Sequence, residues 1–260
     1  IEVMKDIPSG SVDLIVTDPP YNVGLNYGKH YKDNKSKDKY YGWCKEWLKK
    51  CADVLNQNGS FYLISYPEIN SRLLPYIEEE LKLKFRRWIT WHYPTNIGHS
   101  KKNFTRSQRS ILFFTKSDNY VFNRMSIIQH YKNPEVGKIK ERIKNGSKGR
   151  NSYDLLRLLD LVELSNGMID TIDMNLVKNV SKNRVGSMKQ KSKFHHPCQL
   201  PLELLKIFVK VSSKVNNNIL DPFAGTFTLS KVAAELNRNS IGIEINPNYI
   251  RLGLKRLKNG

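Results

Sequence analysis

The stretch VDLIVTDPPY, residues 12–21, begins as an apolar run and ends in a carboxylate, two prolines and an aromatic ring. Its apolar part predicts a buried strand. The strand must end at Asp18, because Pro19 and Pro20 have a fixed φ and lack the N–H groups that a sheet requires. Asp18 and Tyr21 are therefore expected at the carboxyl end of a strand, where open α/β sheets bind their ligands. A strand that merely ends in a proline turn would look the same, so the rest of the chain has to decide.

The 260-residue chain is strongly basic, with 43 Lys and Arg against 24 Asp and Glu and a formal net charge of +19. This surplus favours a polyanionic partner, nucleic acid before membrane, although a lysine-rich proteome would also produce it. Three scattered cysteines argue against a disulfide framework or a zinc site. No apolar run reaches the ~18 residues that span a bilayer, and no signal peptide is visible. We expect a cytoplasmic protein, and Ile1 in place of Met suggests that a short N-terminal piece is absent.

Strand and helix patterns alternate along most of the chain, which predicts a mostly parallel sheet with helices on its faces. Residues 22–39, which follow Tyr21, are polar and rich in tyrosine and predict a mobile loop. The cysteines at 44 and 51 fall in the apolar stripe of a helix and are expected in the core. After the first strand, further strands are expected at 61–64, 86–92, 111–115, 218–221 and 240–245, and helices at 40–55, 67–81, 152–164, 200–213, 226–237 and 247–257.

The segment 124–193 interrupts this alternation and predicts an inserted basic module. Residues 101–150 contain 13 Lys and Arg against 3 Asp and Glu, and residues 175–193 add six basic residues and no acidic one. Aromatic and amide side chains lie among the charges, a mixture that suits contacts to phosphates and to bases. These side chains are Tyr120, Phe122, Asn123, Gln129, His130 and Tyr131.

A second strand with Asp-Pro at its carboxyl end is predicted at 218–221. The small-residue turn Pro222–Gly225 leads directly into a helix, so a ligand can approach the helix N-terminus. Roughly twenty residues later, Glu244 ends the next strand and is suited to bind ribose hydroxyls. Phe227 stands where a dinucleotide loop would have another glycine, which favours a smaller adenosyl ligand. An ordinary βαβ unit with an exposed Glu is the alternative.

The two strand ends are expected to meet if they belong to one doubly wound sheet, because such ends converge on the switch-point crevice. One loop would then hold an adenosyl cofactor. The other would present a carboxylate and an aromatic ring to a second, planar substrate.

These motifs resemble those of the beta class of S-adenosylmethionine-dependent DNA amino-methyltransferases, in which the catalytic motif precedes the cofactor motif. TDPPY (17–21) resembles the catalytic motif, DPFAG (221–225) the cofactor motif and GIEI (242–245) the acidic strand. HPCQLP (196–201) is similar to the segment before the cofactor motif, and WITWH (88–92) and ILFFTK (111–116) are similar to family strands. Two departures exist: Phe227 replaces a glycine of the family, and the family's Gly-Asp strand before Ile1 is missing.

The resemblance implies a doubly wound, Rossmann-like class I methyltransferase fold. It implies a catalytic half at 1–123, a target-recognition insertion at 124–193 and a cofactor-binding half at 194–260. It also implies catalysis by Asp18, Pro19, Pro20 and Tyr21, and no metal. The implied S-adenosylmethionine-binding residues are Asp221, Pro222, Phe223, Ala224, Gly225, Thr226, Thr228, Glu244, Asn246, His196, Pro197 and Gln199.

The implied substrate is double-stranded DNA, and the implied place of action is the nucleoid. The Asp-Pro-Pro-Tyr form favours adenine N6 over cytosine N4, which stays open. A homodimer and a cognate restriction endonuclease of a restriction–modification system are further expectations. Two alternatives remain: an RNA methyltransferase with a similar loop, and a catalytically silent DNA-binding protein with the same fold.

Overall fold

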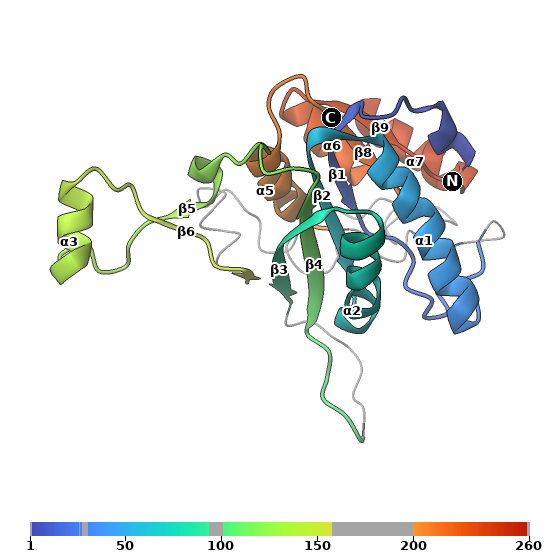
Figure 1. The fold of residues 1–260 in the computed structure, drawn as a ribbon, viewed down its shortest axis with the longest axis horizontal. Coiled ribbons are helices and arrows are strands. Elements are labelled where there is room, and N and C mark those ends of the chain that lie inside the picture. The colour runs from blue at the N-terminus through green and yellow to red at the C-terminus, as the bar shows by residue number, and fades with distance from the viewer. Residues whose placement is uncertain (1, 26, 28–30, 94–100, 158–199, 259–260) are drawn as a thin grey trace.

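A seven-stranded sheet lies at the centre of the computed structural model, which describes residues 2–25, 27, 31–93, 101–157 and 200–258 (Figure 1). The strand order is β7-β3-β4-β2-β1-β8-β9. The strands are β1 Val12–Thr17, β2 Leu55–Ser65, β3 Lys84–His92, β4 Gln108–Thr115, β7 Leu155–Leu156, β8 Asn218–Asp221 and β9 Asn239–Gly242. Four of the six pairings are parallel, and β4 is antiparallel to both β2 and β3. The predicted doubly wound, mostly parallel α/β sheet is confirmed.

Helices cover both faces of this sheet. The helices α1 Lys37–Val54 and α2 Pro67–Pro75, with a π turn at Tyr76–Glu80, cover one face, and α5 Leu202–Ser212 and α6 Thr228–Glu235 cover the other; α7 Pro247–Lys258 packs beside α6. Strand residues alternate between these layers, so that Phe61 and Leu63 contact the α1 side while Tyr62 and Ile64 contact the α5 side. β1 and the central parts of β2 and β4 are buried on both faces and largely apolar, which is why the sequence predicts them.

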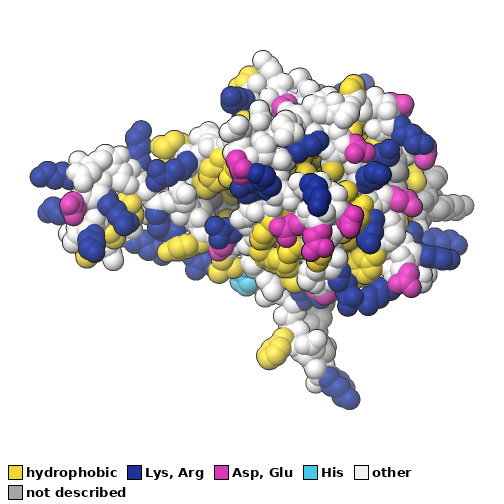
Figure 2. Space-filling model, in the orientation of Figure 1, with side chains coloured by type: hydrophobic (Ala, Val, Ile, Leu, Met, Phe, Trp, Pro, Cys, Tyr) yellow, Lys and Arg dark blue, Asp and Glu magenta, His cyan; other side chains and the backbone are white. Residues whose placement is uncertain are grey.

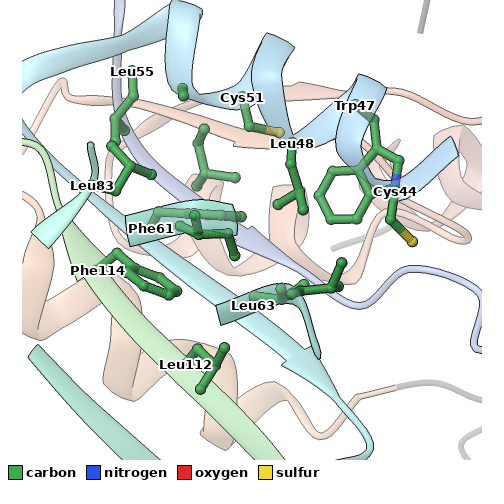
Figure 3. Close-up of a cluster of buried hydrophobic side chains, with 14 of the residues drawn as sticks. Cys44, Trp47, Leu48, Cys51, Leu55, Phe61, Leu63, Leu83, Leu112 and Phe114 are labelled. Carbon is green, nitrogen blue, oxygen red and sulfur yellow. The ribbon is translucent and has the colours of Figure 1, made fainter. Parts of the chain in front are cut away.

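The core beneath α1 contains both of the cysteines predicted there (Figure 3). Cys44 and Cys51 are fully buried and lie in one cluster with Trp47, Leu48 and Phe61. Burial raises the pKa of the Cys44 thiol to about 12. The thiol therefore stays protonated at neutral pH and serves as a small apolar side chain rather than as a nucleophile.

The helix predicted at 152–164 is wrong over the residues that the structure describes. Leu155–Leu156 instead forms β7, which pairs in parallel with Thr90 and Trp91 of β3. Leu156 is buried in that register. Pairing with an otherwise open sheet edge thus overrides the helical spacing of the leucines. Residues 158–164 lie outside the described part of the chain.

A basic arm, residues 128–151, extends away from the sheet (Figure 1). It consists of the antiparallel pair β5 Ile128–Gln129 and β6 Arg150–Asn151 and the helix α3 Gly137–Lys144. Exposed Lys and Arg side chains cover this arm (Figure 2). In the described part of the chain, no helix combines the length and the apolar character required to cross a membrane.

Candidate active site

The carboxyl ends of β1 and β8 lie side by side, because Leu14 and Ile15 pair in parallel with Ile219 and Leu220. The loops that follow the two strands line one cavity. Its lining includes Asp18, Pro19, Pro20 and Tyr21 from the first loop and Asp221, Pro222, Phe223, Ala224, Gly225 and Thr226 from the second. The two strand ends therefore meet, as predicted for a doubly wound sheet.

Asp18 is the first residue of the first loop and lies beside two hydrogen-bond donors, Tyr21 and Arg109. The Tyr21 hydroxyl donates to Asp18 Oδ1. Arg109 Nη1 donates to the Tyr21 hydroxyl at 2.8 Å and lies 3.6 Å from Asp18 Oδ2. Burial is the largest influence and leaves the pKa of Asp18 raised, although the charge of Arg109 and the Tyr21 hydrogen bond act to lower it. The two donors therefore support the ionised carboxylate, which is the form that accepts hydrogen bonds.

The side chains of Tyr40 and Asp33 fix the backbone around Tyr21 by hydrogen bonds. On one side the Tyr40 hydroxyl donates to the Pro20 carbonyl at 2.9 Å. On the other side the buried Asp33 carboxylate accepts N–H groups of Asn22, Val23 and Leu25 at 2.8–3.0 Å. The described residues of the stretch predicted to be a mobile loop are therefore held by an internal acceptor.

The cofactor-side turn is organised by Asp221 and Glu244. Asp221 Oδ1 accepts the Phe223 N–H at 3.0 Å and the Thr17 hydroxyl at 3.2 Å. Glu244 accepts the N–H groups of Gly225 at 2.9 Å and Asn246 at 2.8 Å. Burial raises the pKa of Asp221 to about 7, and it also raises the pKa of Glu244.

The lining of the cavity fits an adenosyl ligand. Phe223 lies 5.1 Å from Trp47 and 5.5 Å from Trp43, measured between ring centroids, and these rings form apolar walls for a flat base. Glu244 can offer carboxylate oxygens to ribose hydroxyls, and the half-buried Asp221 can offer negative charge to a cationic group. A planar base, a sugar and a positive centre are thus each matched by a described residue.

Phe227 adopts a backbone conformation that is typical of glycine, and its side chain does not enter this cavity. It precedes α6 with φ 60° and ψ 38°, in the left-handed region. Its ring packs against Gly242 of β9 and Gly253 of α7, where a Cβ would lie 2.7 Å and 2.2 Å from ring atoms. Phe227 is not among the described residues that line the cavity. The departure from the family's turn is therefore accommodated by two glycines on the far side.

The remaining predicted residues fall into three groups. Thr226 and Thr228 line the cavity, and Thr228 Oγ1 accepts a hydrogen bond from Arg256. Asn246 directly precedes α7; its Oδ1 accepts the Asn248 N–H, and its Nδ2 donates to the Tyr27 carbonyl. His196, Pro197 and Gln199 lie outside the described residues.

Several residues of the site are not apparent from the sequence. Arg109 follows Gln108 at the start of the apolar strand β4 and is 5 % exposed. A charge in a buried strand requires a partner, and this signal could have led to Asp18. Trp43, Trp47 and Tyr66 also line the cavity, but nothing local to them in the sequence indicates it.

Comparisons with known proteins agree with this geometry. A family model described as DNA methylase, of the N6 and N4 type, matches residues 12–255. The type II methyltransferase M.HpaI of Haemophilus parainfluenzae is 32% identical over 260 residues, which are 99% of this chain and 71% of that protein. The DNA adenine methyltransferase YhdJ of Escherichia coli is 31% identical over 98% of this chain and 79% of its own length.

Solved structures share the fold. The PvuII cytosine-N4-specific DNA methyltransferase superimposes with a TM-score of 0.65 at 17% identity, over 98% of this chain and 82% of that one. A complex of M1.HpyAVI with S-adenosylmethionine gives a TM-score of 0.62 at 21% identity, over 98% of this chain and 94% of that one.

Proposed function

The chain belongs to the DNA methylase family whose model it matches, and we propose that it moves a methyl group from S-adenosylmethionine to the exocyclic amine of a base in duplex DNA. The observation that carries the proposal is the single cavity into which the Asp18 loop and the Asp221 loop both open. A hydrogen-bond acceptor for an amine and a site for an adenosyl ligand therefore face the same space.

Asp18 and the Pro19 carbonyl activate the amine in this proposal. An exocyclic amine is a poor nucleophile, because its lone pair is delocalised into the ring. Acceptors for its two hydrogens localise that lone pair toward the methyl donor. Tyr21 stacks on the base, which has to leave the duplex to enter the cavity. Stacking on a ring is worth roughly 1–3 kcal/mol per base, comparable to the cost of flipping.

In this proposal the cofactor is held by the turn at 221–225 and by Glu244, which lies just after β9. Asp221, Glu244 and the Phe223 ring lie where they can bind its cationic, sugar and base parts. S-adenosylmethionine, when bound, supplies an electrophilic methyl group on a sulfonium. Thr226 and Thr228 extend the same wall. Asn246, His196, Pro197 and Gln199 stay in the proposed set on the family motifs alone.

Adenine N6 is the proposed target, with cytosine N4 as the second candidate. The Asp-Pro-Pro-Tyr motif supports adenine, as does the likeness to a DNA adenine methyltransferase at 31% identity. Cytosine is favoured by one observation, the fold shared with a cytosine-N4-specific enzyme. Fold likeness at 17% identity does not transfer a base preference, so the sequence motif weighs more.

The basic arm and the rest of the insertion 124–193 are proposed to contact DNA, between the catalytic half 1–123 and the cofactor half 194–260. Exposed cations on α3 suit phosphate contacts, and amides nearby suit base edges. A second copy of the chain, a partner endonuclease and nucleoid association belong to the same proposal. The type II methyltransferase names of several relatives support the restriction–modification context.

The test is to express the chain in a methylation-deficient host and to map modified bases in the genome. We expect one modified base, N6-methyladenine, in one sequence context. N4-methylcytosine in its place would select the second candidate. An unmodified genome, together with label transfer from S-adenosylmethionine to RNA but not to duplex DNA, would favour an RNA methyltransferase.

Asp18→Ala separates chemistry from cofactor binding. We expect this variant to lose methyl transfer and to bind S-adenosylmethionine almost like the wild type, as measured by calorimetry. Near wild-type methylation by Asp18→Ala would refute the role of Asp18. A wild-type chain that binds DNA but no S-adenosylmethionine would instead be the catalytically silent DNA-binding protein.

A further inference from the structure

Arg109 brings a buried positive charge to the catalytic loop from a different part of the sheet. It lies on β4, which is separated from β1 by β2, and its side chain is 6 % exposed. Its guanidinium carbon lies 4.8 Å from the centroid of the Tyr21 ring, 5.5 Å from that of Tyr66 and 5.9 Å from that of Tyr93. Three aromatic rings thus surround the cation and restrict its orientation.

The hydrogen bonds run in one direction, from Arg109 through Tyr21 to Asp18. Arg109 Nη1 donates to the Tyr21 hydroxyl at 2.8 Å, and that hydroxyl donates to Asp18 Oδ1. A phenol that accepts from a guanidinium is polarised and becomes a better donor. The carboxylate has about four lone-pair sites, so the Tyr21 bond fixes its orientation and leaves acceptor sites for an amine.

The contact between Arg109 and Asp18 matters because it affects whether the Asp18 carboxyl is ionised. Asp18 lines the cavity together with other titratable groups. These include Tyr21 of its own loop, Tyr66 just before α2, Asp221 of β8 and Arg109 of β4. Burial favours a protonated Asp18 and raises its pKa, whereas the charge of Arg109 and the hydrogen bond from Tyr21 oppose this. A protonated carboxyl would be a poorer acceptor for the amine hydrogens.

We propose that Arg109 is a positioning residue for methyl transfer: it keeps Asp18 ionised and, through the Tyr21 hydroxyl, orients it toward the incoming amine. This inference rests on the proposed role of Asp18. It assigns to β4 a part in the reaction that the loop motif alone does not contain. It also gives the Tyr21 hydroxyl a role separate from the stacking of its ring.

Arg106 provides a matched control on the same segment. Its guanidinium carbon lies 3.9 Å from the centroid of Tyr66, and it forms a two-pronged ion pair with Glu68 at the surface. Arg106→Gln therefore removes the same charge and a contact to the same aromatic group, but leaves the bond from Arg109 to the Tyr21 hydroxyl in place. A nonspecific loss of packing would affect both variants.

The experiment measures kcat and the KM for duplex DNA against pH for the wild type, Arg109→Gln, Arg109→Lys and Arg106→Gln. For Arg109→Gln we expect kcat near neutral pH to fall about tenfold or more. The acid limb of its pH–kcat profile should move to higher pH, so that alkaline buffer restores part of the rate. The KM for DNA should change little. Arg109→Lys should keep the acid limb near that of the wild type, and Arg106→Gln should leave the profile unchanged.

Two results would overturn the proposal. One is a folded Arg109→Gln variant that loses the same fraction of kcat at every pH, and the other is one that keeps full activity. If Arg109→Gln does not fold, Tyr21→Phe decides, because it removes only the relay hydroxyl. We expect Tyr21→Phe to move the acid limb in the same direction by a smaller amount, and an unmoved limb would contradict the proposal. An inactive wild type would refute the proposed function itself, whereas an active Asp18→Ala would refute only the role of Asp18 on which this inference rests.

Discussion

The Thr17 hydroxyl donates a hydrogen bond to the Asp221 carboxylate at 3.2 Å, across 204 positions of sequence. Thr17 is the last residue of β1, and Asp221 is the last residue of β8. Asp18 follows Thr17 directly, and Phe223, which lies two residues after Asp221, donates its N–H back to that carboxylate. The bond therefore fixes the Asp18 loop against the Asp221 turn, and it sets the relative position of the two loops that the proposed methyl transfer brings together.

If Asp221 binds the cofactor as proposed, it should make that binding depend on pH near neutrality. Burial raises its pKa to about 7, so the folded protein holds a proton that the unfolded chain has lost. The stability that this proton contributes is present in acid and is lost as the pH rises through about 7. A cationic ligand favours the ionised carboxylate, so binding releases a proton. We expect affinity for S-adenosylmethionine to rise with pH below about 7, by up to roughly tenfold per pH unit.

Calorimetry in two buffers of different ionisation enthalpy checks this coupling. Asp221→Asn should abolish the proton release and flatten the loss of thermal stability between about pH 4 and pH 7. Thr17→Val removes a bond that lowers the pKa of Asp221, so it should move the transition to higher pH, whereas Thr17→Ser should not. Undiminished proton release in Asp221→Asn would show that another group titrates on binding.

The two loops can be predicted from the sequence because each is local in the chain. Proline after a strand-ending aspartate restricts the backbone directly, so Asp18 and Asp221 can be placed at strand ends without a structure. The roles of Arg109 and Asp33 cannot be predicted in this way, because only folding brings them next to the residues that they contact. The spacing of Leu155 and Leu156 fits a helix, and only the open edge of β3 explains their extended conformation.

Asp33 should be needed for activity although it lies outside the cavity. It is 3 % exposed, and its carboxylate is the shared acceptor for the three N–H groups that follow Tyr21. Asp33→Ala removes the carboxylate that accepts these three hydrogen bonds, which should lower the free energy of unfolding by about 1–3 kcal/mol. We expect a lower melting temperature, faster proteolysis after Tyr21 and a kcat/KM reduced about tenfold or more.

The exposed Asp38 at the start of α1 supplies the control. Asp38→Ala removes the same charge from the same region and should change the melting temperature and kcat/KM only slightly. Asp33→Asn retains one acceptor oxygen and should fall between Asp33→Ala and the wild type. Equal activity for all three variants would mean that the loop around Asp33 does not position Tyr21.

The basic arm should account for a measurable part of the salt dependence of DNA binding. Lys138, Arg142 and Lys144 are exposed on α3, whereas Lys140 is paired with Glu135 at 3.2 Å. Replacing the first three by Gln should weaken DNA binding and reduce the slope of log K against log salt by about 0.9 for each phosphate that the variant no longer neutralises. Affinity for S-adenosylmethionine should not change. Fluorescence anisotropy with a labelled duplex at several salt concentrations measures the affinity for DNA and its salt slope.

A triple variant on α7 matches this change in charge and residue type. Arg251, Lys255 and Lys258 are exposed on α7, which lies at the end of the molecule away from the arm (Figure 1). Their replacement by Gln removes three positive charges, so it reports the effect of net charge alone. If both triple variants reduce the salt slope equally, the arm makes no phosphate contacts of its own.

Phe227 should stabilise the turn through its ring and strain it through its backbone. Phe227→Ala keeps the left-handed φ of 60° and removes the ring, with an expected loss of about 3–5 kcal/mol in the free energy of unfolding. Phe227→Gly removes the same ring but relieves a conformation that costs other residues about 1–2 kcal/mol. The Gly variant should therefore be the more stable of the two, as judged by urea unfolding. The reverse order would mean that the left-handed conformation carries no strain here.

A double-mutant cycle with Gly253 tests how the ring is accommodated. A Cβ at Gly253 would lie 2.2 Å from Phe227 Cδ2, a distance that forces the ring or α7 to move. Gly253→Ala should therefore destabilise the wild type by about 1–3 kcal/mol. In the Phe227→Gly background the clash is absent, and the same change should be neutral or slightly stabilising because it removes a glycine from a helix. The coupling energy should thus exceed about 1 kcal/mol, and additive effects would show that the ring does not occupy the space beside Gly253.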